Sequence, residues 1–96
     1  MSDQQQPPES PDYAGLAGYG SARESASDAV LGVMAWYAEQ IVLEQRRPAP
    51  DPARVEELMS ERRAARSDLE RARTIDLQEA ERIADAYVAR LRDLTA

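Results

Sequence analysis

The sequence predicts an all-α fold, an antiparallel three-helix hairpin or bundle that follows a disordered N-terminal arm. Apolar residues recur at helical spacing in three segments, and no run of β-branched residues alternates with a period of two. Prolines and helix-start signals separate the three segments by short connections, which make consecutive helices antiparallel neighbours. With 96 residues in all, the chain is expected to form one domain over residues 21–96, preceded by an arm over residues 1–20.

The arm is set apart by its composition. Residues 1–20 hold three Gln, three Pro, three of the four Gly and no Arg. Such a segment buries too little apolar surface to offset the entropy lost on ordering, so it is predicted to be disordered in the free protein. Tyr13, Leu16 and Tyr19 follow one another at intervals of three residues. They are either a short docking segment that orders on a partner or part of a flexible leader.

The first helix is predicted over residues 22–47, because Pro48, Pro50 and Pro52 end any helical pattern. Its centre is uncharged from Ala29 to Ala38. One half of its circumference is apolar and is expected to face the core: Val30, Leu31, Val33, Met34, Tyr37, Ala38, Ile41 and Val42. A second apolar patch lies off this arc and comprises Gly32, Trp36 and Leu43. A helix that is apolar on two sides is central in its fold or shared with a partner.

The second and third helices, predicted over residues 52–73 and 77–94, carry clear start signals. Asp51 is an expected N-cap with Pro52 at the first helical position, and Asp76 with Glu79 forms a capping box. The second helix has one apolar face at helical spacing, formed by Val55, Leu58, Met59, Ala65, Leu69 and Ala72. The face of the third helix comprises Ala80, Ile83, Ala84, Tyr87, Val88, Leu91 and Leu94, with Tyr87 and Leu91 directed at the first helix.

Several chemistries are excluded by residues that the chain lacks. It contains no Cys, His or Lys, which removes thiolate nucleophiles, Cys-ligated zinc, the commonest general base and Schiff-base chemistry. We therefore expect no enzyme activity and no catalytic, cofactor-binding or metal-binding residues. The net charge of −6 disfavours nucleic acid and anionic membrane surfaces as partners. No signal peptide or membrane-spanning run is recognisable, and the exclusive use of Arg suggests a GC-rich coding sequence, so a bacterial cytoplasmic protein is expected.

In outline, the chain resembles the epsilon-type antitoxins, small acidic three-helix proteins that inhibit zeta-type toxin kinases. The resemblance covers the shape, length and charge of the three helices, and it assigns no role to a particular residue. It implies a first helix that blocks the nucleotide site of a toxin. The function expected is that of a protein-binding regulator, the antitoxin or inhibitor of a toxin enzyme in a bacterial toxin–antitoxin pair, within a hetero-oligomer.

Seven residues are predicted to bind the partner. Four lie on the first helix and three in the arm: Gly32, Trp36, Glu39, Leu43, Tyr13, Leu16 and Tyr19. Trp is enriched among interface anchors, and Gly32 one turn before Trp36 is expected to leave room for a partner's side chain. Two alternatives remain open: a structural homodimer whose Trp36 faces form a four- or six-helix bundle, and an adaptor with a docking arm.

Overall fold

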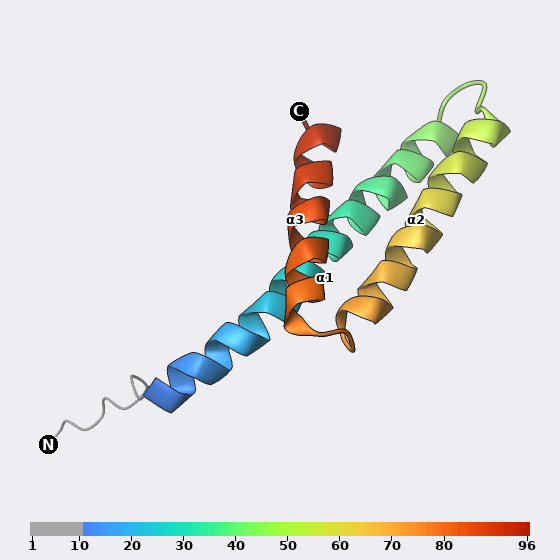
Figure 1. Ribbon diagram of the computed structural model, residues 1–96. Coiled ribbons are helices and arrows are strands. Elements are labelled where there is room, and N and C mark those ends of the chain that lie inside the picture. The colour runs from blue at the N-terminus through green and yellow to red at the C-terminus, as the bar shows by residue number, and fades with distance from the viewer. Residues whose placement is uncertain (1–10) are drawn as a thin grey trace, which may run out of the picture.

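The chain forms three helices and, over the residues that the structure describes, no strand (Figure 1). The computed structural model describes the backbone of residues 11–96 and the side chains of residues 22–96. The helices are α1 (Pro11–Gln45), α2 (Pro52–Ala72) and α3 (Leu77–Leu94). The predicted all-α class and the three-helix architecture are confirmed.

Helix α1 begins at Pro11 rather than at residue 22. Half of the predicted arm, residues 11–20, therefore belongs to the helix, and residues 1–10 lie outside the described residues. Proline is tolerated in the first turn of a helix, and none follows between residues 12 and 47 to interrupt it. The glycines of this segment lower helix propensity by about 1 kcal/mol each, but they do not prevent helical backbone geometry.

The starts of α2 and α3 follow the predicted caps. The Asp51 side chain accepts hydrogen bonds from the backbone N–H groups of Ala53 and Arg54, and Pro52 is the first helical residue. The Asp76 side chain accepts one from the backbone N–H of Glu79 at 2.8 Å. These bonds satisfy N–H groups that the helix itself cannot pair, so they fix where each helix begins.

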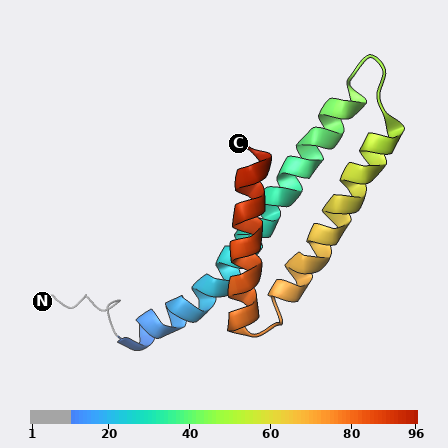
Figure 2. The same ribbon diagram turned by 45° about the horizontal axis from the view of Figure 1, so that its top comes forward.

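Helix α1 is the central element of the fold. Helix α2 runs antiparallel to its C-terminal half, whereas α3 crosses it at an angle and then stands away from it (Figures 1 and 2). Each of the two helices packs extensively on α1, but they touch one another far less. Helix α3 thus meets α1 around Gly32, where Leu91 packs, whereas the C-terminal end of α1 lies beside α2 and away from α3 in both views (Figures 1 and 2).

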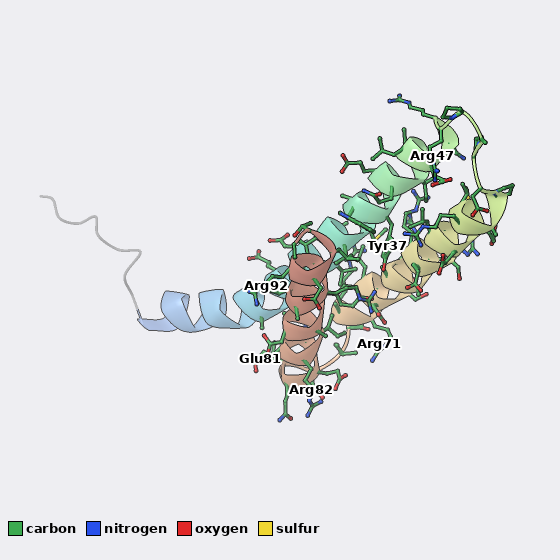
Figure 3. All side chains as sticks on the ribbon, turned by 90° about the horizontal axis from the view of Figure 1, so that it is seen from above. Tyr37, Arg47, Arg71, Glu81, Arg82 and Arg92 are labelled. Carbon is green, nitrogen blue, oxygen red and sulfur yellow. The ribbon has the colours of Figure 1, made fainter. Side chains whose placement is uncertain are left out.

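The core is a single cluster between the three helices. Tyr37 lies in the middle of the molecule, while charged side chains such as Arg47, Arg71 and Arg92 project from its periphery (Figure 3). The buried apolar residues are Ala26, Ala29, Val30, Val33, Tyr37, Ile41, Leu58, Ala65, Leu69, Ala72, Ala80, Ile83, Ala84 and Tyr87. The predicted core faces of α2 and α3 are thus largely confirmed.

Three residues predicted to face the core are instead exposed. Leu31 is 48% exposed and Val42 42% on α1, and Val88 is 43% exposed on α3. They lie at the margins of their apolar faces. The apolar residues of α1 span half of its circumference, but α2 and α3 cover less than half. The residues at the edge of the apolar arc therefore remain in solvent.

Candidate protein-binding surface

Gly32 does not provide the space for a partner that the sequence predicted. A Cβ atom built on Gly32 would lie 3.0 Å from Cδ2 of Leu91 on α3. That position is already filled by Leu91, which packs against the core and thereby faces α1 as expected. Gly32 therefore brings α3 close to α1, which is a packing role within the fold.

Trp36 lies at the boundary between core and surface. It is half-buried, packs against the core cluster and meets the ring of Tyr37 edge-on, with ring centroids 5.4 Å apart. Edge-to-face pairs of this kind contribute about 0.5–1.5 kcal/mol beyond burial. Trp36 thus contributes to the fold and leaves only part of its indole ring open to a partner.

Glu39 and Leu43 extend this boundary into an exposed surface. Both are exposed, and the Leu43 side chain is 49% accessible. Gly32, Trp36 and Leu43 are separated by four and seven residues, so they share one side of α1. Near Gly32 that side is covered by Leu91 of α3, whereas Leu43 is exposed, and α3 leans away from the C-terminal end of α1 (Figures 1 and 2). We call Trp36, Glu39 and Leu43 the Leu43 face.

A second exposed apolar surface runs along a different side of α1. Leu31, Ala35, Ala38 and Val42 follow one another at steps of four, three and four residues, which places them in one row. Leu31, Ala35 and Val42 are exposed, and Ala38 is half-buried. We call this row the Leu31 stripe. Its spacing is that of a coiled-coil seam.

The three remaining predicted partner-binding residues cannot be placed in this surface. Tyr13, Leu16 and Tyr19 fall within α1, whose first residue is Pro11. Their side chains lie outside the described residues. Their proposed docking role stays a prediction.

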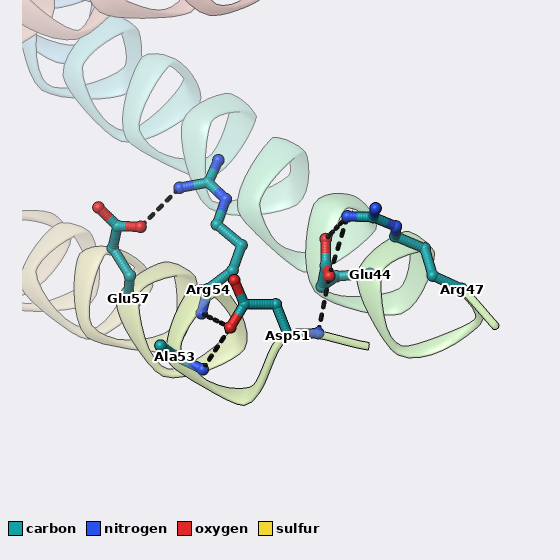
Figure 4. Close-up of polar contacts among 6 residues, drawn as sticks. All are labelled: Glu44, Arg47, Asp51, Ala53, Arg54 and Glu57. Carbon is teal, nitrogen blue, oxygen red and sulfur yellow. Dashed lines mark hydrogen bonds and ion pairs between the residues drawn. The ribbon is translucent and has the colours of Figure 1, made fainter. Parts of the chain in front are cut away.

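A buried carboxylate that the sequence reasoning missed organises the connection between α1 and α2 (Figure 4). Glu44 is only 8% exposed. Its carboxylate accepts the backbone N–H of Asp51 at 2.9 Å and pairs with the Arg47 guanidinium at 3.1 Å. The Asp51 N–H, and then Arg47, hold the pKa of Glu44 below its usual value against the opposing effect of burial. The sequence does contain a signal for this contact: Glu44 is a single acidic residue within the apolar half of the first helix, shortly before the prolines at 48, 50 and 52.

A second polar contact joins α2 to α3. The Tyr87 hydroxyl donates a hydrogen bond to the Asp68 carboxylate, and the Arg90 guanidinium lies 4.6 Å from the centre of the Tyr87 ring. Burial, reinforced by the neighbouring Asp68 carboxylate, raises the pKa of Tyr87 to about 12. Nearby, Arg71 pairs with Asp68 at 3.1 Å and with Glu79 at 3.8 Å. These contacts fasten α3 to α2.

Both polar clusters hold helices of the fold together. Glu44 and Tyr87 each serve contacts within the fold, and no set of three metal-ligating side chains gathers among the described residues. No helix in the described part of the chain has the length and apolar character to cross a membrane. Among the described residues, the large apolar side chains left exposed are Leu31, Val42 and Leu43 on α1 and Val88 on α3.

No protein-family model, curated protein or solved structure matches this chain.

Proposed function

We propose that this chain is a small, non-catalytic regulator of the bacterial cytoplasm that binds and inhibits an enzyme, as the antitoxin of a toxin–antitoxin pair. The observation that carries the proposal is the Leu43 face. A large apolar side chain stands 49% exposed there, beside an exposed carboxylate and a half-buried Trp. Trp is enriched among interface anchors, so the open part of the Trp36 ring is the expected anchor, and the exposed Leu43 side chain adds apolar contact area beside it.

The charge of the chain supports a partner with a basic surface. The net charge is −6, and Glu39 places one carboxylate within the Leu43 face. Complementary charge accelerates association and orients the two proteins before the apolar contact forms. A toxin that binds anionic phosphate groups would present such a basic surface. The outline resemblance to epsilon-type antitoxins points to a zeta-type toxin kinase as the enzyme inhibited.

The direct test is co-purification of the chain with the product of the adjacent gene, followed by a binding titration. Leu43→Ala is expected to weaken the complex by about five- to thirty-fold, equivalent to ~1–2 kcal/mol. Val88→Ala is the matched control, because Val88 is similarly exposed but lies on α3. It should leave the affinity unchanged. Glu39→Arg should slow association, with an effect that diminishes as salt is added.

Trp36 requires a stability measurement beside the binding measurement. Because Trp36 packs on the core and on Tyr37, Trp36→Ala should lower the melting temperature as well as the affinity. If Leu43→Ala and Glu39→Arg both leave binding unchanged, the inhibitory surface lies elsewhere on the chain. If the adjacent gene product does not bind the wild-type chain at all, the inhibitor proposal is wrong.

A further inference from the structure

We infer that the Leu31 stripe binds a second copy of this chain, so that two α1 helices pair antiparallel across a two-fold axis. The stripe is unpartnered in the structure: Leu31 is 48% and Val42 42% exposed, and Ala35 is also exposed. It lies on a different side of α1 from the Leu43 face. The inference is thus independent of the proposed inhibitory function.

The stripe is complementary to itself. If two copies are laid antiparallel with the axis between Ala35 and Ala38, Leu31 of one copy lies opposite Val42 of the other. The same operation places Ala35 opposite Ala38. Every apolar residue of the stripe thus meets an apolar residue of the second copy, as an isologous two-fold interface requires. The two alanines at the centre allow the helix axes to approach closely, while Leu31 and Val42 fill both ends.

The charges beyond the stripe select the antiparallel direction. One turn before Leu31, Asp28 is exposed, and one turn after Val42, Arg46 is exposed. In an antiparallel pair with the same axis, Asp28 of one copy lies next to Gln45 and Arg46 of the other. A parallel pair would instead bring Asp28 onto Asp28 and Arg46 onto Arg46, which is repulsive. Antiparallel helices also place opposite ends of their dipoles side by side.

The small number of anchors sets the strength of the dimer. Two of the four stripe residues are alanines, so most of the apolar area comes from Leu31 and Val42. Stable interfaces bury about 1,200–2,000 Å² of surface in total. The area that two α1 helices would bury along the Leu31 stripe lies at or below the lower end of that range. We expect a reversible dimer with a dissociation constant on the order of micromolar.

Sedimentation equilibrium of the full chain, from roughly 1 to 500 μM, tests this inference over the range around a micromolar constant. The wild type should shift from monomer to dimer across that range. Leu31→Glu and Val42→Glu should each weaken self-association at least ten-fold. Val88→Glu is the matched control, because Val88 is 43% exposed but lies outside the stripe. It should dimerise like the wild type. Circular dichroism of each variant establishes that the monomer remains folded.

A charge swap tests the direction of pairing. Asp28→Arg alone and Arg46→Asp alone should each weaken the dimer, and the double variant should restore it. Because the chain has no Cys, mixing Ala35→Cys with Ala38→Cys chains offers a second check. Disulfides should form preferentially between the two different variants. A chain that stays monomeric at the highest concentration overturns the inference. A dimer that tolerates Leu31→Glu and Val42→Glu but is lost on Leu43→Glu also overturns it, by assigning the interface to the Leu43 face.

Discussion

Replacing Gly32 with alanine should show that α3 is seated against the backbone of α1 at that position. In a helix interior, Gly→Ala stabilises by about 1 kcal/mol through helix propensity alone. Here the new Cβ would lie 3.0 Å from Cδ2 of Leu91, closer than the ~3.5–4.0 Å of ordinary carbon contacts. Leu91 must shift by a few tenths of an ångström to relieve this contact, and a shift that turns its side chain away from a staggered angle costs about 0.5–1.5 kcal/mol. The two effects oppose one another, and Gly32→Ala should change the free energy of unfolding by less than ~0.5 kcal/mol.

The contact becomes measurable in a double-mutant cycle with Leu91→Ala. Leu91 is half-buried, so Leu91→Ala alone should cost about 2 kcal/mol, at the low end of the range for leucine. With the Leu91 side chain removed, Gly32→Ala should recover its full helix-propensity gain of about 1 kcal/mol. Urea unfolding followed by far-UV circular dichroism gives the four free energies. If Gly32→Ala stabilises equally in both backgrounds, α3 does not pack on Gly32 and its crossing position is assigned wrongly.

Two further predictions concern pH and use the buried polar contacts. The pKa of Glu44 is lowered in the folded state, so its contribution is present at neutral pH and is lost as pH falls through that lowered pKa. Glu44→Gln should therefore lower the melting temperature at neutral pH, and the difference from wild type should vanish in acid. The pKa of Tyr87 is raised to about 12, so its contribution persists below the usual tyrosine value of 10.0 and is lost as pH rises through about 12. In an ultraviolet titration, the rise in tyrosinate absorbance near pH 12 should be smaller for Tyr87→Phe than for the wild type, and an unchanged titration would contradict the Tyr87–Asp68 contact.

The boundaries of α2 and α3 could be predicted from sequence because the signals that set them are local. Asp51 with Pro52, and Asp76 with Glu79, lie within a few residues of the N–H groups that they cap. The start of α1 has no comparable signal among the glycines of residues 12–20. Composition therefore suggested an arm where the backbone is helical from Pro11.

The surface was harder to predict because it depends on how the helices cross. Periodicity shows that α1 has a broad apolar arc, but it does not show how much of that arc its neighbours cover. Leu31 and Val42 were therefore expected in the core, and Gly32 was expected to be open although Leu91 fills its side. The role of Glu44 depends on a loop that returns the Asp51 N–H to it seven residues later. Only a three-dimensional structure could bring that pair together.

The sparse contact between α2 and α3 has a consequence for cooperativity. Each helix is anchored to α1, and their direct contacts are few, with Tyr87 bonded to Asp68 and Arg71 paired with Glu79. Helix α3 can therefore detach from α1 without opening the hairpin of α1 and α2. Backbone amides of α3 should exchange with solvent faster than those of α1 beneath α2, which should exchange only on global unfolding. This 96-residue chain would then unfold in two steps, with α1 as the last element to lose its protection.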